Sequence, residues 1–281
     1  MVTVKLVLDS INPFGNRLST FEIELPKFLL AQLNTHRQLS RNAASSRAIP
    51  LKRFRELATY TPRVWWANDK GMQPISPIPM HEGYINAEFA WHAARTAALE
   101  EHGHMEHYGV HKQQANRLLE PFAMVKVLVS ATEWDNFLNL RLSAGAQDEM
   151  QDVAQQVGRL LLDNVPVTQP WLQWHTPLVW TGYGEVDEGL VGIHTIDFEH
   201  VHKISAGRCA RVSYLNHDGT RDPLKDEELA ERLVKDGHLS PFEHVAVAVP
   251  GSHANYKGWC SYRRFLLDET RVNDSWKGLI K

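Results

Sequence analysis

Residues 35–47 read THRQLSRNAASSR and contain no acidic side chain. The basic and imidazole side chains in this stretch are His36, Arg37, Arg41 and Arg47, and small polar residues separate them. Arginines and hydroxyls without a local acid suit a phosphate or another doubly charged anion. The same composition is compatible with a solvated loop whose cations pair with distant acids, so the motif by itself leaves both interpretations open.

Two strands are predicted upstream of this stretch. VTVKLVLD (2–9) and STFEIEL (19–25) alternate and are rich in β-branched or apolar side chains, as half-buried strands are. KFLLAQLNTHRQL, directly after Pro26, has the composition of a helix that begins at a proline.

The middle of the chain is predicted to be mainly helical. Residues 85–119 have the pattern of one long helix, residues 122–142 are apolar with helical spacing, and residues 146–165 are amphipathic. The proline-rich residues 62–84 predict a long loop.

Shorter elements are predicted towards the C-terminus. Residues 204–214 resemble a short buried segment that leads into a strand, residues 225–237 form a helix with acids in the first turn, and VAVAVP (245–250) is a strand. The sequence therefore predicts a single α+β domain over residues 1–281, with an antiparallel or mixed sheet flanked by long helices and a helical part at about 85–165.

The bulk composition excludes several classes of protein. Hydrophobic residues make up 43% of the 281 residues and charged residues 22%, which is ordinary for a soluble globular domain. A net charge of −3 and a pI near 6.6 argue against general nucleic-acid binding, so we expect no nucleic-acid partner. The N-terminus lacks a signal-peptide pattern and no run of about 18 apolar residues exists, so we expect no membrane span and a cytoplasmic protein.

Three polar residues form a second candidate patch: Arg117, Asn136 and Arg141. Arg141 lies among leucines in the sequence, and a buried arginine needs a partner. An anionic ligand is one such partner, and Asp148 or Glu149 is the alternative.

A third candidate is DGHLSPFEHVAV (236–247), where His238, Ser240, Glu243 and His244 crowd a turn before a strand. Turns of this kind often carry function. Local capping by the serine and the glutamate is the alternative.

The histidines at positions 104, 107 and 111 are three and four residues apart, so one helix face could present several imidazoles to a metal. The H-E-x-x-H arrangement of a metallohydrolase is missing, and a partly exposed polar helix face is the interpretation that we favour. We therefore predict no metal site.

The chain has two cysteines, Cys209 and Cys260, which is too few for a disulfide framework and fits a reducing compartment. Cys209 lies between Arg208 and Arg211, and nearby cations can lower the pKa of a thiol. A small buried residue is the more common role of a free cysteine.

Together the three polar patches resemble the flavin-dependent thymidylate synthases. The signature of that family is Arg-His-Arg, two residues, Ser, one residue, Asn-Glu, one residue, Ser, one residue, Arg-Tyr. The positions that match it here are His36, Arg37, Ser40, Asn42, Ser45 and Arg47. The family's first Arg, its Glu and its final Tyr are replaced by Thr35, Ala43 and Ala48.

Two further segments resemble the same family. NFLNLRLSAGAQDEM (136–150) is similar to its Phe-Leu-x-Leu-Arg and Ala-Gln-x-Glu-Ile segment, and CARVSY (209–214) with GHLSPFEH (237–244) is similar to its Ala-Arg-Val-Ser and Pro-Phe-Glu-His segments. In the usual member the last of these precedes the Arg-His-Arg motif, whereas here it follows. The chain thus resembles a phage-type member with a circularly permuted motif order, which folds tolerate when the new ends lie at the surface.

This resemblance implies an enzyme that transfers a one-carbon unit from methylenetetrahydrofolate to C5 of a deoxypyrimidine monophosphate, with dUMP to dTMP as the main expectation. It implies FAD, NADPH and methylenetetrahydrofolate as cofactors, a homotetramer with shared active sites, and no protein nucleophile.

The resemblance also implies roles for individual residues. The catalytic residues would be Arg141 and Gln32. The substrate-binding residues would be Arg37, Ser45, Arg47, Arg117 and Arg141, with Arg47 and Arg117 on the phosphate. The flavin contacts would be His36, Asn136, Ser213, His238 and Ser240.

Two departures from the family pattern leave alternatives open. Ala43 removes a carboxylate from the neighbourhood of the base, and Thr35 removes a cation. One alternative keeps the fold and the flavin but hydroxymethylates dUMP or dCMP, or methylates dCMP. An alternative of another class is a non-catalytic nucleotide-binding protein without flavin.

Overall fold

Two neighbouring antiparallel strands, β2 (Arg17–Pro26) and β4 (Met124–Ala131), form the centre of the molecule. The computed structural model describes residues 1–71, 73–74, 76–79, 82–179, 200–212 and 222–266. The central pair belongs to a five-stranded sheet of order β3-β4-β2-β1-β5. The other strands of this sheet are β1 (Thr3–Ile11), β3 (Ser40–Ala43) and β5 (Val167–Thr168). Only β5 among these pairs in parallel, so the sheet is mixed.

A second sheet has three antiparallel strands in the order β6-β7-β8. Its strands are β6 (Trp174–His175), β7 (Ala246–His253) and β8 (Tyr256–Ser261). The α-helices are α1 (Leu30–Leu33), α2 (Leu51–Leu57), α3 (Glu82–His107), α4 (Lys112–Ala115), α5 (Asp135–Arg141), α6 (Asp148–Asp163), α7 (Val201–Ala210) and α8 (Pro223–Lys235). The 3₁₀ helices are η1 (Lys27–Leu29), η2 (Asn116–Phe122), η3 (Ser240–Glu243) and η4 (Tyr262–Phe265).

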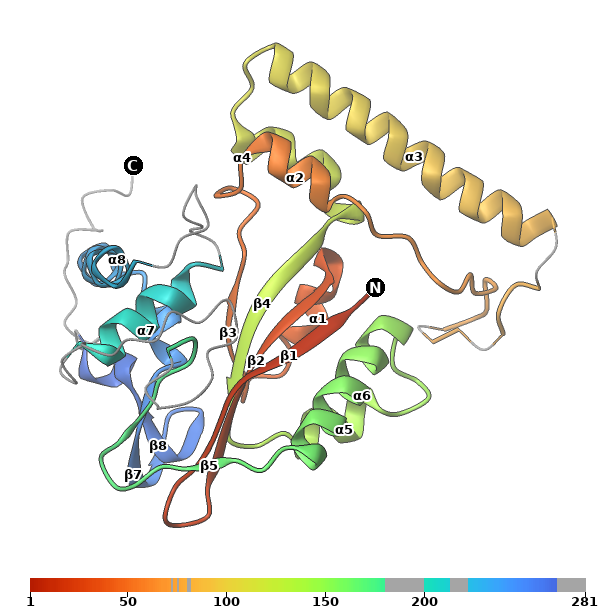
Figure 1. The fold of residues 1–281 in the computed structure, drawn as a ribbon. Coiled ribbons are helices and arrows are strands. Elements are labelled where there is room, and N and C mark those ends of the chain that lie inside the picture. The colour runs from red at the N-terminus through yellow and green to blue at the C-terminus, as the bar shows by residue number, and fades with distance from the viewer. Residues whose placement is uncertain (72, 75, 80–81, 180–199, 213–221, 267–281) are drawn as a thin grey trace, which may run out of the picture.

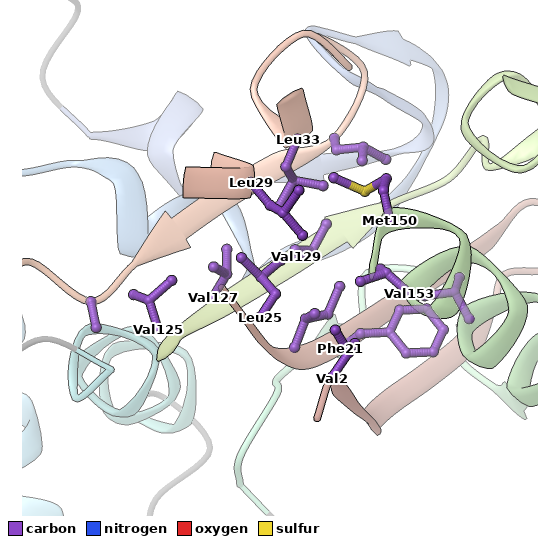
Figure 2. Close-up of a cluster of buried hydrophobic side chains, with 14 of the residues drawn as sticks. Val2, Phe21, Leu25, Leu29, Leu33, Val125, Val127, Val129, Met150 and Val153 are labelled. Carbon is purple, nitrogen blue, oxygen red and sulfur yellow. The ribbon is translucent and has the colours of Figure 1, made fainter. Parts of the chain in front are cut away.

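The two faces of the central strands differ because side chains alternate along a strand. On one face the apolar cross-strand pairs are Phe21 with Val129, Ile23 with Val127, and Leu25 with Val125. These side chains pack with residues of η1, α1 and α6 in the main hydrophobic core (Figure 2). The opposite face is partly polar, and there Thr20 lies across from Ser130.

Figure 1 shows how segments from both ends of the chain meet at this sheet. Helices α5 and α6 lie beside the N-terminal strands, and the long α3 runs at the far edge of the molecule. The C-terminal unit of α7, α8, β7 and β8 lies on the side of the sheet where β3 is the edge strand. This places η3 next to residues 40–43, because η3 packs against β3.

The α+β class with a mixed sheet and flanking helices is confirmed. The predicted strands at 2–9, 19–25 and 245–250 match β1, β2 and β7, and the amphipathic segment 146–165 contains α6. Among the helices of the described ranges, none has both the length and the apolar character that crossing a membrane requires. The extent of a single domain over all 281 residues stays a prediction.

Three predictions of secondary structure were wrong. Residues 124–131 form the strand β4, not a helix; seven of its eight residues are buried, so the strand lacks the alternation that reveals one-sided burial. Residues 201–210 form the helix α7 where a buried, non-helical segment leading to a strand was expected; eight of its ten residues are buried, so no apolar face stands out in the sequence, and residues 213–214 of the expected strand lie outside the described residues. The expected helix 85–119 ends early, because Gly109 turns the chain at a positive φ of 72° before α4 begins.

Candidate active site

Arg141 and His36 form the centre of the candidate site. The Nε of Arg141, in the last turn of α5, donates to the Nε2 of His36 at 2.8 Å, and Nη2 of the same arginine donates to the hydroxyl of Thr35 at 3.3 Å. A guanidinium has no acceptor, so Nε2 of His36 is the acceptor and the imidazole is neutral. Burial lowers the pKa of His36, and the cations of Arg141 and Arg41 lower it further. The pair therefore consists of one cation and a neutral ring.

The ring of His36 is also fixed from other sides. It packs edge-on against Phe137 with ring centroids 5.0 Å apart, and Arg41 donates to the carbonyl oxygen of His36. Arg141 itself uses Nε and Nη2 for His36 and Thr35, and its Nη1 has no hydrogen bond to any part of the chain that the structure describes. The guanidinium is thus oriented by its Nε edge and retains donors for an anion or a carbonyl group.

Gln32, in α1, has an unused acceptor next to this pair. Its amide nitrogen donates to Gln147 at 3.3 Å, whereas its Oε1 is buried and has no hydrogen-bond partner in the part of the chain that the structure describes. Gln32 lies one helical turn before Thr35, whose hydroxyl donates to the Gln32 carbonyl oxygen at 2.7 Å. A buried carbonyl oxygen without a donor is costly, and a bound N–H group would satisfy it.

Residues 45–47 meet Arg117 through Glu120. The hydroxyl of Ser46 donates to Oε1 of Glu120 at 2.6 Å, and Arg117 donates to the same oxygen at 3.0 Å. Lys27 lies 3.5 Å from that oxygen. Arg47 directly follows Ser46, is exposed, and makes no ion pair with any described residue. Two cations, Lys27 and Arg117, therefore share one carboxylate, and Arg47 follows Ser46 in the sequence, which leaves excess positive charge for a phosphate.

Asn42 and Ser240 connect the two ends of the chain. The hydroxyl of Ser240, the first residue of η3, donates to Oδ1 of Asn42 in β3 at 3.3 Å. The amide nitrogen of Asn42 donates to the Cys209 carbonyl oxygen in α7 at 3.0 Å. Two motifs about two hundred residues apart in the sequence are therefore in direct contact, as the permuted order requires.

The remaining predicted site residues have different surroundings. Arg37, Asn136 and His238 are exposed, and their side chains have no ion pair or hydrogen bond to any described part of the chain. Ser45 is half-buried in the loop before α2. Ser213 lies outside the described residues.

Several alternatives from the sequence were wrong. Asp148 and Glu149 do not neutralise Arg141, because they accept from Trp66 and Tyr60 instead. Glu243 forms an ion pair with Arg263 at 2.6 Å, and the Ser240 hydroxyl reaches Asn42 and does not cap its own helix. Thus the side chains of Ser240 and Glu243 do not act as local helix caps.

The histidines and cysteines take structural positions. His102 is fully buried and its Nε2 lies 3.0 Å from Oδ1 of Asn116, whereas His104 and His107 are exposed. Within the described ranges, no group of three or more His, Cys, Asp or Glu side chains could hold a metal ion. Burial raises the pKa of the Cys209 thiol, so the two flanking arginines do not make it a thiolate.

Sequence patterns missed three residues of the site. Glu120 was missed, although its spacing of three from Arg117 on one helical turn was a usable signal. Thr35 was considered only because it replaces the family's first arginine, but its hydroxyl accepts a hydrogen bond from Nη2 of Arg141. Arg41 was grouped with the anion-binding residues, but it anchors the backbone at His36.

One family model supports these motifs. The family model described as thymidylate synthase complementing protein matches residues 12–167, which is more than half of the chain. No curated protein matches the chain. Similar solved structures include a UMP/dUMP methylase PolB from Streptomyces cacaoi bound with 5-Br dUMP, at 17% identity over 58% of this chain and 90% of that chain, with a TM-score of 0.49. The same methylase bound with 5-Br UMP aligns at 16% identity over 58% and 89%, with a TM-score of 0.43.

The family match thus identifies a thymidylate synthase-like enzyme. The chain belongs to the thymidylate synthase complementing protein family, the flavin-dependent family that its motifs resemble. The matched region includes the Arg-His-Arg-type motif and Arg141, and the GHLSPFEH segment at 237–244 lies beyond it. Membership supports one-carbon transfer to a pyrimidine nucleotide as the class of reaction.

Proposed function

We propose that this chain transfers a one-carbon unit from methylenetetrahydrofolate to C5 of a deoxypyrimidine monophosphate in a flavin-dependent reaction, with dUMP to dTMP as the main reaction. The observation that carries the proposal is the contact between Ser240 and Asn42, which joins two separate family motifs into one site. Family membership supports FAD as cofactor, NADPH as reductant and a homotetramer with shared sites. The composition, with two cysteines, supports a cytoplasmic location.

The phosphate of the nucleotide would bind at residues 45–47 and Arg117. Arg47 and Arg117 are both exposed, so they can reach an anion without displacing a core contact. Glu120 holds Arg117 and Ser46 in place through one oxygen, which preorganises the two sides of this anion site. Ser45 would add a hydroxyl donor to the same phosphate.

The base would lie against Arg141 and Gln32. Arg141 keeps donors for a pyrimidine carbonyl oxygen, while Oε1 of Gln32 offers an acceptor for a ring N–H. Arg37 would lie at the border of nucleotide and flavin. These residues act by orienting the base and by placing positive charge where negative charge develops during transfer. A protein nucleophile is not part of this proposal, because both cysteines are buried.

The residues present fit a flavin. The exposed side chains of Asn136 and His238 complement the N–H and carbonyl groups of an isoalloxazine ring. Ser240 would contribute a hydroxyl beside them, and His36 would contact the flavin through its ring edge, since its Nε2 is engaged by Arg141. When bound, the flavin supplies the hydride that reduces the transferred carbon. Ser213 remains part of the proposal from its motif position only.

Ala43 favours a second candidate reaction on the same fold. It lies in β3, paired with Val127, at the position where the family has a glutamate. Without that carboxylate, hydroxymethylation of dUMP or dCMP, or methylation of dCMP, becomes the competing reaction. A product assay with both nucleotides separates these outcomes.

Flavin binding tests the proposal first. The purified protein is expected to be yellow, or to become yellow with a flavin absorbance band when FAD is added. dUMP is then titrated with and without FAD by calorimetry. Colourless protein that ignores FAD but binds dUMP would support the non-catalytic nucleotide-binding alternative and contradict the proposal.

A further inference from the structure

Five buried side chains form a continuous hydrogen-bonded chain between the two sheets. Nδ1 of His244 lies 2.8 Å from the Ser130 hydroxyl, which lies 2.6 Å from the Thr20 hydroxyl. Thr20 lies 2.8 Å from Nε2 of His175, and Nδ1 of His175 lies 2.8 Å from the Ser10 hydroxyl. All five residues are fully buried. We call this set the buried polar chain.

Both imidazoles in the buried polar chain are neutral. Burial lowers the pKa of His175 and of His244 to about 3, and in each case desolvation is the largest cause. A neutral imidazole has one donor and one acceptor nitrogen, and each hydroxyl has one proton. His175 uses both nitrogens within the buried polar chain, whereas Nε2 of His244 has no hydrogen-bond partner among the described residues.

The buried polar chain connects elements that the sequence separates. Ser10, Thr20 and Ser130 come from β1, β2 and β4 of the five-stranded sheet, and His175 comes from β6 of the second sheet. His244 directly follows η3, the segment that begins with Ser240. The link between His244 and Ser130 therefore connects η3 to the central strands from the side opposite the main core.

The near end of the buried polar chain is close to the candidate site. Ser130 of β4 is paired with Ser40 of β3, and Asn42 lies two residues further along β3 on the same face. Asn42 is the residue that Ser240 contacts. The His244–Ser130 pair thus holds the chain directly after η3, where the Tyr256 hydroxyl also donates to the Glu243 carbonyl oxygen at 2.8 Å, and the Ser240–Asn42 pair holds the beginning of η3.

We propose that Ser130 and His244 are positioning residues that set the register of η3 against β3, and through it the place of Ser240 and His238 in the flavin site. Apolar residues of the same shape would fill this part of the core without demanding one arrangement. A buried network of hydrogen-bonded polar groups favours one relative position of η3 and β3, because any shift leaves a polar group without its hydrogen bond. The expected effect on FAD affinity rests on the proposed function, whereas the expected effect on the position of η3 does not.

The test compares two identical substitutions at opposite ends of the buried polar chain. Ser130→Ala removes the link beside η3, and Ser10→Ala removes the terminal link in β1, which is the matched control. Hydrogen–deuterium exchange of residues 238–245 is the first readout and needs no ligand. Ser130→Ala is expected to speed exchange in this segment, and Ser10→Ala is expected to leave it unchanged even if both variants melt at lower temperature.

FAD affinity is the second readout. Ser130→Ala is expected to weaken FAD binding by about fivefold, the equivalent of one neutral hydrogen bond, with Ser10→Ala near the wild-type value. Ser130→Thr retains the hydroxyl and is expected to restore both readouts. If Ser130→Ala fails to fold, Ser130→Cys takes its place, since it keeps the shape with a weaker hydrogen-bonding group.

The outcomes separate this proposal from the assignment of flavin. Equal exchange in residues 238–245 for Ser130→Ala and Ser10→Ala would overturn the positioning role, whatever FAD does. Faster exchange in Ser130→Ala alone, in a protein that binds no FAD, would retain the positioning role and reject the flavin assignment.

Discussion

Arg141 donates from Nε to Nε2 of His36 at 2.8 Å, and this contact orients the arginine by means of a neutral ring. In the proposed site, the motif residue His36 would therefore orient Arg141 for the nucleotide and also face the flavin. A cation in place of the ring would repel Arg141, so the lowered pKa of His36 is required for this arrangement.

Replacing His36 tests this orientation. His36→Leu is expected to weaken binding of dUMP, measured without FAD, by about 1.5–3 kcal/mol, because Arg141 loses a hydrogen bond from its charged group. His36→Gln retains an acceptor and is expected to recover most of the affinity. Calorimetric affinities that are the same for both variants and the wild type would show that Arg141 is oriented by other contacts.

Arg47 is expected to contribute binding and no folding stability. Arg47→Ala should weaken dUMP binding by at least about 1.5–3 kcal/mol, the range for a charge-assisted hydrogen bond. Its melting temperature should not change, because the side chain is exposed and pairs with no described residue. Arg53→Ala is the matched control, since Arg53 is an exposed arginine of α2 whose one ion pair within the described ranges is with the exposed Glu56. Unchanged dUMP affinity in Arg47→Ala would refute its assignment to the phosphate.

Gly207 and Gly158 are expected to respond in opposite ways to alanine. A Cβ on Gly207 in α7 would lie 2.0 Å from the Asp226 carbonyl oxygen of α8, so Gly207→Ala should destabilise the protein by about 1–3 kcal/mol. A Cβ on Gly158 in α6 would meet only Leu138 at 3.6 Å, and Gly158→Ala should stabilise the helix by about 0.5–1 kcal/mol. Urea unfolding measures both changes. Equal effects at the two positions would mean that α7 and α8 do not pack this closely.

The stability of the fold is expected to decrease in mild acid. His175 and His244 have a pKa of about 3 in the folded protein, against about 6.5 in the unfolded chain. Below about pH 6.5 the unfolded chain binds protons that the folded protein does not. Each unit by which the pH is lowered therefore lowers the free energy of unfolding by up to about 1.4 kcal/mol for each histidine. His175→Asn should reduce this slope between about pH 7 and pH 5.5. A slope equal to that of the wild type would show that His175 titrates normally in the folded state.

Some of this structure could be predicted from the sequence for physical reasons. Strands β1 and β2 were predictable because alternation and β-branching report a half-buried strand. Strand β4 was not, because burial on both faces removes the alternation. The contact of Ser240 with Asn42 followed from the family motifs, whereas the Arg141–His36 bond depends on how α5 approaches the loop before β3, and local pattern does not encode that approach.

The product of the reaction tests the central claim most directly. The protein is incubated with FAD, NADPH, methylenetetrahydrofolate and either dUMP or dCMP, and the nucleotide is examined by mass spectrometry. We predict that dUMP gains the mass of a methyl group in place of a hydrogen, and that this gain requires FAD. A gain of a hydroxymethyl group, or a mass gain on dCMP alone, would show that the enzyme catalyses the competing reaction and not dTMP formation. No change in either nucleotide with flavin-loaded protein would contradict one-carbon transfer itself.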